Sequence, residues 1–318
     1  MTAAGVLLGW AVLIGAAVPA VLRRSTWPQR APNLGLVVWQ AASASFLLAL
    51  VLGGLTLAVP ATVLSGGLAD LVANCVMAVQ AAYRTPAGAG AAGTGIVLTA
   101  TVATRATWCL VHGLAGAAVR RRRHARRLAL VAQRDATLDA LIVDHDAAQA
   151  YCLPGRRSVI VLTSSALAAL DCGHVDAVLA HERAHLRARH HLVVTAAAAL
   201  ARAFPRVPLL RDAAIAIPRL VEMAADDAAG SRAGRSQVAA ALVTLAAAAP
   251  PAATLAAGGP TALTRVQRLL RPPTPLTCIA AIATVAVALA LTTAPVIAAV
   301  APALTAGHMP DCRAALAR

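Results

Sequence analysis

The sequence has 318 residues, a hydrophobic content of 59% and a mean hydropathy of +0.71. Only 13% of the residues are charged, against about a quarter in soluble domains, which excludes a wholly soluble protein and indicates a membrane protein with a modest soluble part. The formal net charge is +15, but aromatic residues make up only 3%, which argues against a stacking platform for single-stranded nucleic acid.

Two apolar segments open the chain. The first covers residues 1–22, and the positive charges of Arg23 and Arg24 follow it instead of preceding it. That order is typical of a span with its N-terminus outside, and a signal peptide would show the reverse, so we predict a first span at residues 4–22. The second segment, residues 34–59, is long enough to cross with some tilt. The less hydrophobic residues 60–93 should form an external loop.

The third apolar segment, residues 95–118, ends in the strongest charge cluster of the chain, the arginine-rich residues 120–127. One interpretation of the cluster is a nucleic-acid patch, and the other, which we prefer, is a cytoplasmic flank of the span. We expect a basic helix to continue through residues 126–135. Arg105, inside the apolar segment, should snorkel toward the outer surface, and we assign it no function.

Residues 119–273 are too polar to cross the membrane and are long enough for one domain. We expect short strands near residues 139–144, 148–153 and 158–163, because these stretches are bounded by turn residues and the last is rich in β-branched residues. A helical run then extends from residue 174 to about residue 200.

That run contains His181-Glu182-Arg183-Ala184-His185. Residues four apart share one face of a helix, so the two imidazoles can point at one metal ion. Glu182 would lie beside the open position of the metal, as the general base does in zinc proteases. A strand beside a zinc helix is commonly an open edge, so we expect residues 158–163 to be able to pair with an extended substrate.

A catalytic zinc site normally has three protein ligands, and the third is expected downstream. Glu222 and Asp226 are also four apart and share a face of a second helix. Glu222 can complete the ligand set, and Asp226 can hold the free N–H of a ligand imidazole. Either motif alone is common on solvated helices, whereas the two in this order are specific.

The remaining segments complete a four-span topology. Residues 192–204 are apolar but short, which indicates a buried or membrane-surface helix in place of a span. Helices are expected at residues 236–249 and 261–270, and the fourth span at residues 276–300. Its basic N-terminal flank directs it outward. Both termini should then lie outside, and the metal domain should be cytoplasmic.

The six cysteines contain no C-x-x-C pair, which leaves a zinc knuckle or a thioredoxin-like motif unsupported. Cys75 and Cys312 are the two that fall in external segments. Because disulfides persist in oxidising compartments, we hypothesise a bridge between the external loop and the external tail.

Residues 180–185 and 222–228 together resemble the motifs of the BlaR/MecR-type membrane metallopeptidases, relatives of the HtpX and CAAX-prenyl-protease gluzincins. The expected topology agrees with that resemblance. It implies one Zn²⁺ per chain, held by His181, His185 and Glu222, with Glu182 as the base and Asp226 orienting a ligand. The antibiotic-sensing members carry a penicillin-binding domain after the last span, where this sequence has a short tail, so a β-lactam sensor is not expected.

The sequence therefore predicts a mainly α membrane protein of four spans, with an α+β zincin-like domain (His-Glu-x-x-His and Glu-x-x-Ala-Asp) between the third and fourth. We expect a zinc metalloendopeptidase of the cell membrane that cleaves a protein or peptide, such as a transcriptional repressor or a membrane protein under quality control. The oligomeric state is left open. Four residues near the motifs are candidates for an oxyanion donor: His190, His191, Arg219 and Arg232.

Three other functions are alternatives to proteolysis. A signalling or scaffold protein could use the zinc domain mainly to bind a partner. A transporter fits poorly, since the spans show no repeat and no paired broken helices. A DNA-binding membrane regulator would use residues 120–127, and nucleic acid is the less favoured partner of that cluster.

Overall fold

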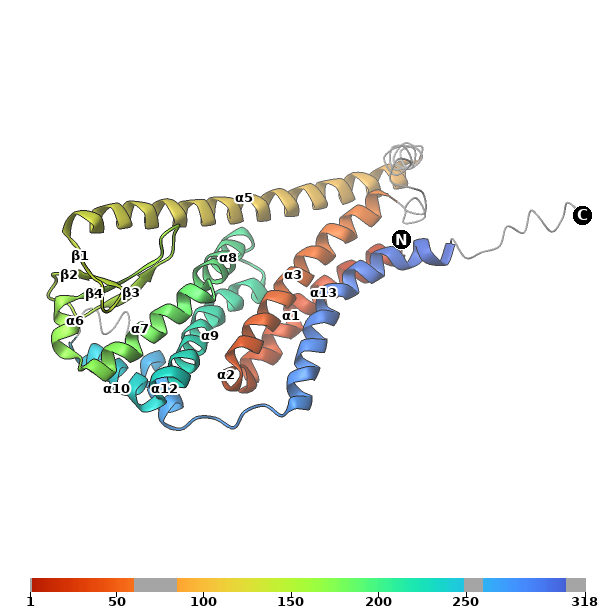
Figure 1. Ribbon diagram of the computed structural model, residues 1–318. Coiled ribbons are helices and arrows are strands. Elements are labelled where there is room, and N and C mark those ends of the chain that lie inside the picture. The colour runs from red at the N-terminus through yellow and green to blue at the C-terminus, as the bar shows by residue number, and fades with distance from the viewer. Residues whose placement is uncertain (1, 60–84, 249–259, 307–318) are drawn as a thin grey trace, which may run out of the picture.

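The computed structural model describes residues 2–59, 85–248 and 260–306, and Figure 1 shows them as a largely helical chain with one small sheet. The helices are α1 (Thr2–Arg24), α2 (Trp27–Arg30), α3 (Pro32–Ala58), α5 (Pro86–Val131), α6 (Ser164–Ala169), α7 (Cys172–Arg187), α8 (His190–Ala203), α9 (Pro208–Ala233), α10 (Arg235–Ala248), α12 (Pro260–Leu270) and α13 (Cys278–Ala306). The strands are β1 (Gln133–Asp135), β2 (Ala140–Val143), β3 (Ala150–Leu153) and β4 (Val159–Thr163). Cys75 and Cys312, the expected disulfide, lie outside the described residues, and so does most of the expected external loop.

Among the described helices, α1, α3, α5 and α13 are long and apolar enough to cross a membrane. This confirms the expected set of four candidate spans by length and composition. The helices α1, α3 and α13 pack side by side, and α5 meets α3 at one end (Figure 1). Many of their large apolar side chains are exposed, as expected for surfaces that face lipid.

Helix α5 is longer than the predicted third span at both ends. It begins at Pro86, where the Thr85 side chain accepts a hydrogen bond from the Gly88 backbone N–H, so residues 86–93 are helical and do not belong to a loop. It then continues without a break through the arginine-rich residues, because arginine and alanine are good helix formers. The helix ends at Val131, and the prediction of a basic helix to residue 135 was wrong there, since Gln133–Asp135 pair with β2.

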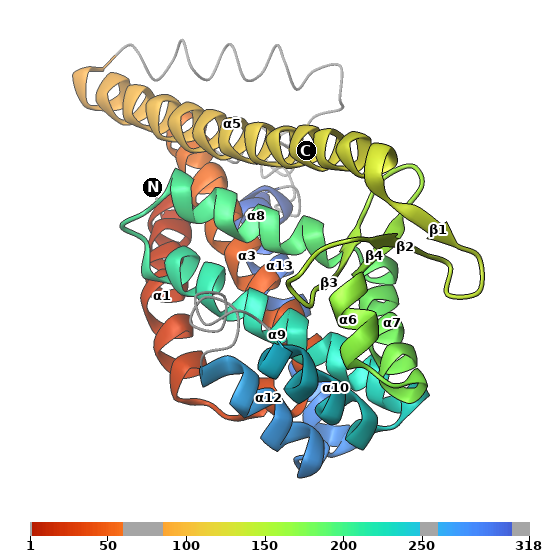
Figure 2. The same ribbon diagram turned by 90° about the vertical axis from the view of Figure 1, so that its left-hand side faces the viewer.

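The sheet has the strand order β1-β2-β4-β3. The pair β2–β4 is parallel and the other two pairs are antiparallel. The expectation that residues 158–163 form an open edge was wrong, because β4 pairs on both sides. The strand at the edge beside α7 is β3 (Figure 2).

The expected helical run from residue 174 to about residue 200 is two helices. Asp171 caps α7 by accepting a hydrogen bond from the His174 backbone N–H, and the helix stops at Arg187. Arg189 then adopts a left-handed conformation with φ 50° and ψ 38°, a strained arrangement for a residue with a side chain, and reverses the chain into α8.

Helix α8 runs along α5 and packs between α5 and α9 (Figure 2). A Cβ at Gly113 of α5 would lie 3.1 Å from the Ala199 Cβ, so this glycine allows the two helices to approach closely. The Arg105 Nε donates a hydrogen bond to the Ala203 carbonyl at the end of α8, which adds a polar contact between the two helices. The apolar residues 192–204 are therefore a packed helix.

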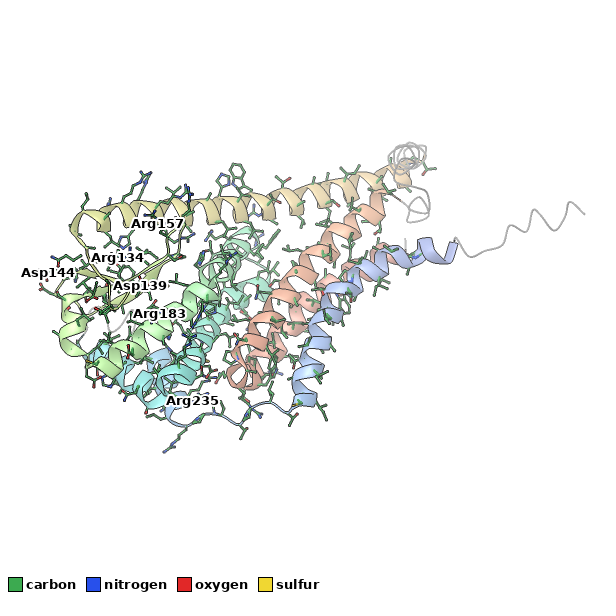
Figure 3. The ribbon with its side chains drawn as sticks, viewed as in Figure 1. Arg134, Asp139, Asp144, Arg157, Arg183 and Arg235 are labelled. Carbon is green, nitrogen blue, oxygen red and sulfur yellow. The ribbon has the colours of Figure 1, made fainter. Side chains whose placement is uncertain are left out.

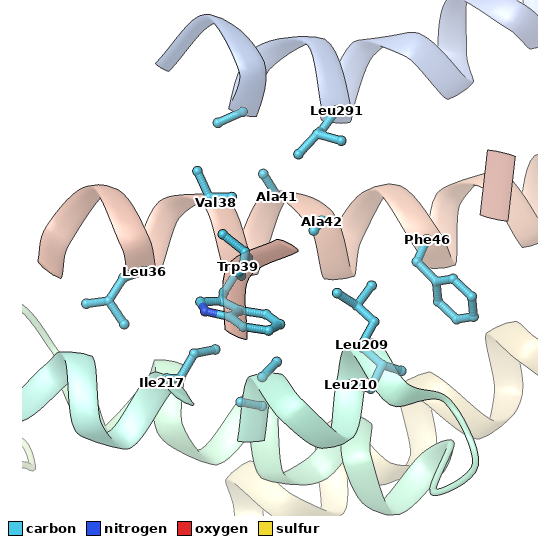
Figure 4. Packing of buried hydrophobic residues seen from close by; sticks show 14 of the residues in the cluster. Leu36, Val38, Trp39, Ala41, Ala42, Phe46, Leu209, Leu210, Ile217 and Leu291 are labelled. Atoms are coloured by element: carbon cyan, nitrogen blue, oxygen red, sulfur yellow. The ribbon is translucent and has the colours of Figure 1, made fainter. Parts of the chain in front are cut away.

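Helix α9 joins the membrane helices to the metal domain. Its first half packs against α3, where Leu209, Leu210 and Ile217 face Trp39 and Phe46 (Figure 4). Its second half packs against α7 and α10 beneath the sheet, in a second core built around the buried Leu179 and Ala229. The position of Glu222 in α9 is thus fixed by apolar packing at both ends of one helix.

Candidate metal centre

The two histidines of α7 meet as their spacing predicts. The Nε2 atoms of His181 and His185 lie 3.0 Å apart on one face of the helix. Both side chains are largely buried, with exposures of 12% and 15%. Two imidazole nitrogens at this distance face a common point, which is the arrangement of a pair of metal ligands.

Glu222 of α9 completes a group of three. Its Oε2 lies 3.5 Å from the His181 Nε2, and its Oε1 lies 3.6 Å from the His185 Nε2. These ligand atoms all lie within 4.8 Å of one another. Donor atoms bound tetrahedrally to zinc at about 2.0–2.1 Å are about 3.3–3.4 Å apart, so the observed spacing suits one zinc ion.

Asp226 lies where a residue that orients a ligand is expected. Its Oδ1 is 3.1 Å from the His181 Nδ1, the ring nitrogen that faces away from the group of three. The Asp226 side chain is only 1% exposed. A carboxylate held there fixes the ring orientation of His181 and makes its other nitrogen a stronger donor to a metal.

Arg265 of α12 is a residue of the centre that the sequence analysis missed. Its Nε and Nη2 each donate a hydrogen bond of 2.7 Å to the Asp226 carboxylate, and its Nη1 lies 3.1 Å from the Glu222 Oε2. Arg268, one turn later, donates two hydrogen bonds to Asp227. The signal in the sequence was two arginines three apart on an amphipathic helix, matching two adjacent aspartates.

Charge and burial set the protonation of the three ligands. Burial lowers the pKa of His185 to about 4, although the Glu222 charge opposes this, so its imidazole is neutral near pH 7. Burial would raise the pKa of Glu222, but hydrogen bonding to His181 and the Arg265 charge outweigh it and hold the pKa at about 2. Burial would lower the pKa of His181, but Asp226 and Glu222 raise it to about 9, so the same carboxylates make this ring a strong base.

Glu182 lies in a cavity of about 190 Å³ together with His181, Glu222 and Arg265. Burial raises the pKa of its carboxyl, and the Glu222 charge adds to the effect while His181 opposes it. Interaction with the thiol and the backbone of Cys152, on the edge strand β3, also opposes the rise in pKa. This carboxylate is therefore held beside the ligand group with a raised proton affinity, as a general base requires.

The structure places the four oxyanion candidates elsewhere. The His190 Nδ1 lies 3.1 Å from the His185 Nδ1, so this buried ring lies behind a ligand and orients it. His191 lines a separate cavity beside α5, and Arg219 lines one beside α1. Arg232 is exposed near the end of α9. The described residues that line the metal-site cavity include none of the four, and Arg265 is the cation found there.

The arrangement can hold a divalent ion with two nitrogen donors and one carboxylate, leaving one side open toward Glu182. Such a set of ligands is that of a hydrolytic zinc site. No curated protein and no solved structure matches the chain. Residues 117–272 match the sequence model of peptidase family M48. This region contains the three candidate ligands together with Glu182, Asp226 and Arg265. Residues 117–272, from the C-terminal part of α5 to just before α13, are therefore a metallopeptidase domain of peptidase family M48.

Proposed function

We propose that the protein is an integral-membrane zinc metalloendopeptidase that hydrolyses peptide bonds of a protein substrate. The observation that carries the proposal is the convergence of His181, His185 and Glu222, with atoms 3.0–3.6 Å apart, beside the half-buried carboxyl of Glu182. The family match and the four apolar helices support it.

The chemistry follows from the positions of these side chains. A zinc ion held by the three ligands would act as a Lewis acid toward the scissile carbonyl and the attacking water. Glu182 takes the proton of that water and passes it to the leaving amine. Arg265 lies in the same cavity and keeps Glu222 and Asp226 ionised. Strand β3, next to Glu182, is an edge strand of the described sheet, and an extended substrate can pair with the backbone groups on its free side.

Within the family we assign the chain to the BlaR/MecR type, with the metal domain on the cytoplasmic face. Support comes from the order of elements, in which three candidate spans precede the domain and one follows it. The orientation is supported by arginines in the C-terminal parts of α1 and α5 and before α13. The cellular substrate would be the protein whose fragments disappear when Glu182→Gln replaces the wild type in cells.

The direct test is Glu182→Gln in the purified protein, with unfolded casein as the substrate. Glutamine keeps the shape of the side chain but cannot accept the proton, so we expect zinc to remain bound at one per chain and cleavage to fall by about 10²–10⁴-fold. Glu222→Gln serves as the matched variant and should lose zinc together with activity. Undiminished cleavage by Glu182→Gln would refute the mechanism, and a protein that never binds zinc would refute the proposed function.

A further inference from the structure

The arginine-rich end of α5 forms one wall of a large cavity. The cavity has a volume of about 1060 Å³ and lies between α5, the turn that joins β3 to β4, and the corner between α7 and α8. Helix α5 contributes Arg121, Arg122 and Arg126, which share one face at helical spacing. The arginines at positions 120, 123 and 127 lie on the other faces of the same helix.

The other two walls are also lined by arginine. The β3–β4 turn contributes Arg156 and Arg157, and Figure 3 shows Arg157 beside α5. The α7–α8 corner contributes Arg187 and Arg189. Three separate segments thus direct positive charge into one space. A cytoplasmic flank of a span explains only the first of them.

Among the residues that the structure describes, these charges lack counterions. No acidic side chain is among the described residues that line the cavity. Within the described ranges, none of its arginines forms an ion pair, and the buried Arg121 Nε has no hydrogen-bond partner. The pKa of His191, at the rim, is lowered by burial and by the charges of Arg121 and Arg189. Arginines gathered in one cavity without acidic partners attract an anion with several oxygen acceptors.

The cavity continues into a surface suited to lipid. Going back along the same face of α5 from Arg122, each step of three or four residues reaches Ala118, Ala115, Val111 and Trp108. Val111 and Trp108 are 55% and 62% exposed, within the stretch that is apolar enough to span a membrane. Leu192 of α8, on the rim of the cavity, is 38% exposed. A basic cavity that opens onto an apolar stripe matches a molecule with an anionic head and an acyl chain.

We propose that this cavity binds the phosphate-bearing headgroup of an anionic phospholipid, whose acyl chain lies along the Trp108–Val111 face of α5. Phosphate oxygens accept the paired N–H groups of the arginines, and the apolar stripe shields the chain from water. Soluble phosphate shares the headgroup chemistry, and a nucleic acid shares the charge, but neither accounts for the stripe. The site is independent of the metal centre and does not rest on the proposed hydrolysis.

The test measures lipid retention by the full-length protein in detergent, using native mass spectrometry. The probes are dioctanoyl phosphatidylglycerol and dioctanoyl phosphatidylcholine, which share their chains, together with inorganic phosphate and a short DNA duplex. The cavity variant combines Arg121→Gln, Arg122→Gln and Arg126→Gln. The matched control combines Arg120→Gln, Arg123→Gln and Arg127→Gln, which removes equal charge from the same helix.

We expect wild type and control to retain phosphatidylglycerol and not phosphatidylcholine, and the cavity variant to bind phosphatidylglycerol on the order of 100-fold more weakly. Equal losses in both triple variants, or equal retention of the two lipids, would overturn the site. Inorganic phosphate or DNA bound as tightly as phosphatidylglycerol would overturn its assignment to a lipid. If the cavity variant does not fold, the double variant Arg156→Gln with Arg157→Gln, in a surface turn, takes its place. Its retention of the two lipids is then measured in the same way.

Discussion

Arg265 contacts both carboxylates of the metal centre and cannot be replaced by a simple point charge. Its planar guanidinium donates two hydrogen bonds to Asp226 while a third nitrogen lies 3.1 Å from Glu222. Lysine cannot form this fork. We therefore expect Arg265→Lys to weaken zinc binding by about 10–100-fold, the usual effect of losing a residue that orients ligands. Competition with a zinc chelator measures the affinity.

Arg268→Lys is the control for that prediction. Arg268 makes the same kind of paired contact, but to Asp227, which touches no ligand. This variant should lower the stability of the fold and leave zinc affinity within about twofold of wild type. Equal zinc affinities for the two variants would show that Arg265 acts only as a structural brace.

The lowered pKa of the Asp226 carboxyl should make the stability of the fold depend on pH. Burial would raise its pKa, but hydrogen bonds from Arg265 and His181 lower it from 3.8 to about 2. Because the folded pKa lies below the unfolded one, the carboxylate stabilises the fold above about pH 4, by about 2 kcal/mol, and this contribution is lost as the pH falls through 2. We expect metal-free Asp226→Asn to be less stable than wild type at pH 6, with the gap closing at low pH in denaturant titrations. A gap that stays constant with pH would contradict the pairing.

The residues of the centre differ in how well the sequence reveals them. Helical spacing of four puts His181 with His185, and Glu222 with Asp226, on one face of a helix, and this local property can be recognised directly in the sequence. Arg265 lies 39 residues from Asp226, and the contact depends on how α12 docks against α9. The position of His190 behind His185 depends on the left-handed backbone conformation of Arg189. The sequence has no glycine or asparagine at this position that would indicate a turn.

At the level of helices, the crossing of α3 and α5 depends on two glycines, Gly54 of α3 and Gly95 of α5. A Cβ at Gly95 would lie 2.8 Å from both the Ala58 backbone nitrogen and the Leu57 Cβ. Small residues allow such close approach between membrane helices. We expect Gly95→Ala to force the helices apart and destabilise the protein by about 1–3 kcal/mol. Thermal unfolding in detergent should show it.

Gly93→Ala provides the comparison, because a Cβ there meets nothing within 4 Å. This substitution lies in the same helix and should leave stability unchanged or slightly raised, since alanine is the better helix former. Similar melting temperatures for the two variants would mean that α3 and α5 do not cross at Gly95.

The surroundings of two elements, β4 and α8, could not be predicted from the sequence because they depend on segments distant in the chain. The sequence predicts a strand at residues 158–163 from its β-branched residues, but the central place of β4 in the sheet depends on pairing with β2 and β3. The apolar residues of α8 were too few for a span, and only the close approach at Gly113 shows that α5 covers them. Composition and periodicity identify such segments, whereas docking decides their neighbours.

For the whole molecule, the continuity of α5 links the bilayer to the metal domain. A helix of 46 residues is about 69 Å long, more than twice the thickness of the hydrocarbon core of a bilayer. One end therefore lies in or near the membrane with α3, while the other carries the arginines and leads into the sheet. Helix α9 makes a second connection, since the packing of Leu209 and Leu210 on α3 and the position of Glu222 belong to one rigid helix.

The orientation of this assembly gives the last prediction. Arginines lie at the end of α1, in the C-terminal part of α5 and just before α13. Because such clusters stay in the cytoplasm, we expect the metal domain to face the cytoplasm and the start of α5 to face outward. Cys172, exposed at the start of α7, reports on the domain, and Thr85→Cys reports on the exposed start of α5. With the other cysteines replaced by serine, we expect a membrane-impermeant maleimide to label Thr85→Cys in intact cells and Cys172 only after permeabilisation. Because Thr85 precedes α5 and Cys172 follows it in the chain, the reverse labelling pattern would invert the whole topology and place proteolysis outside the cell.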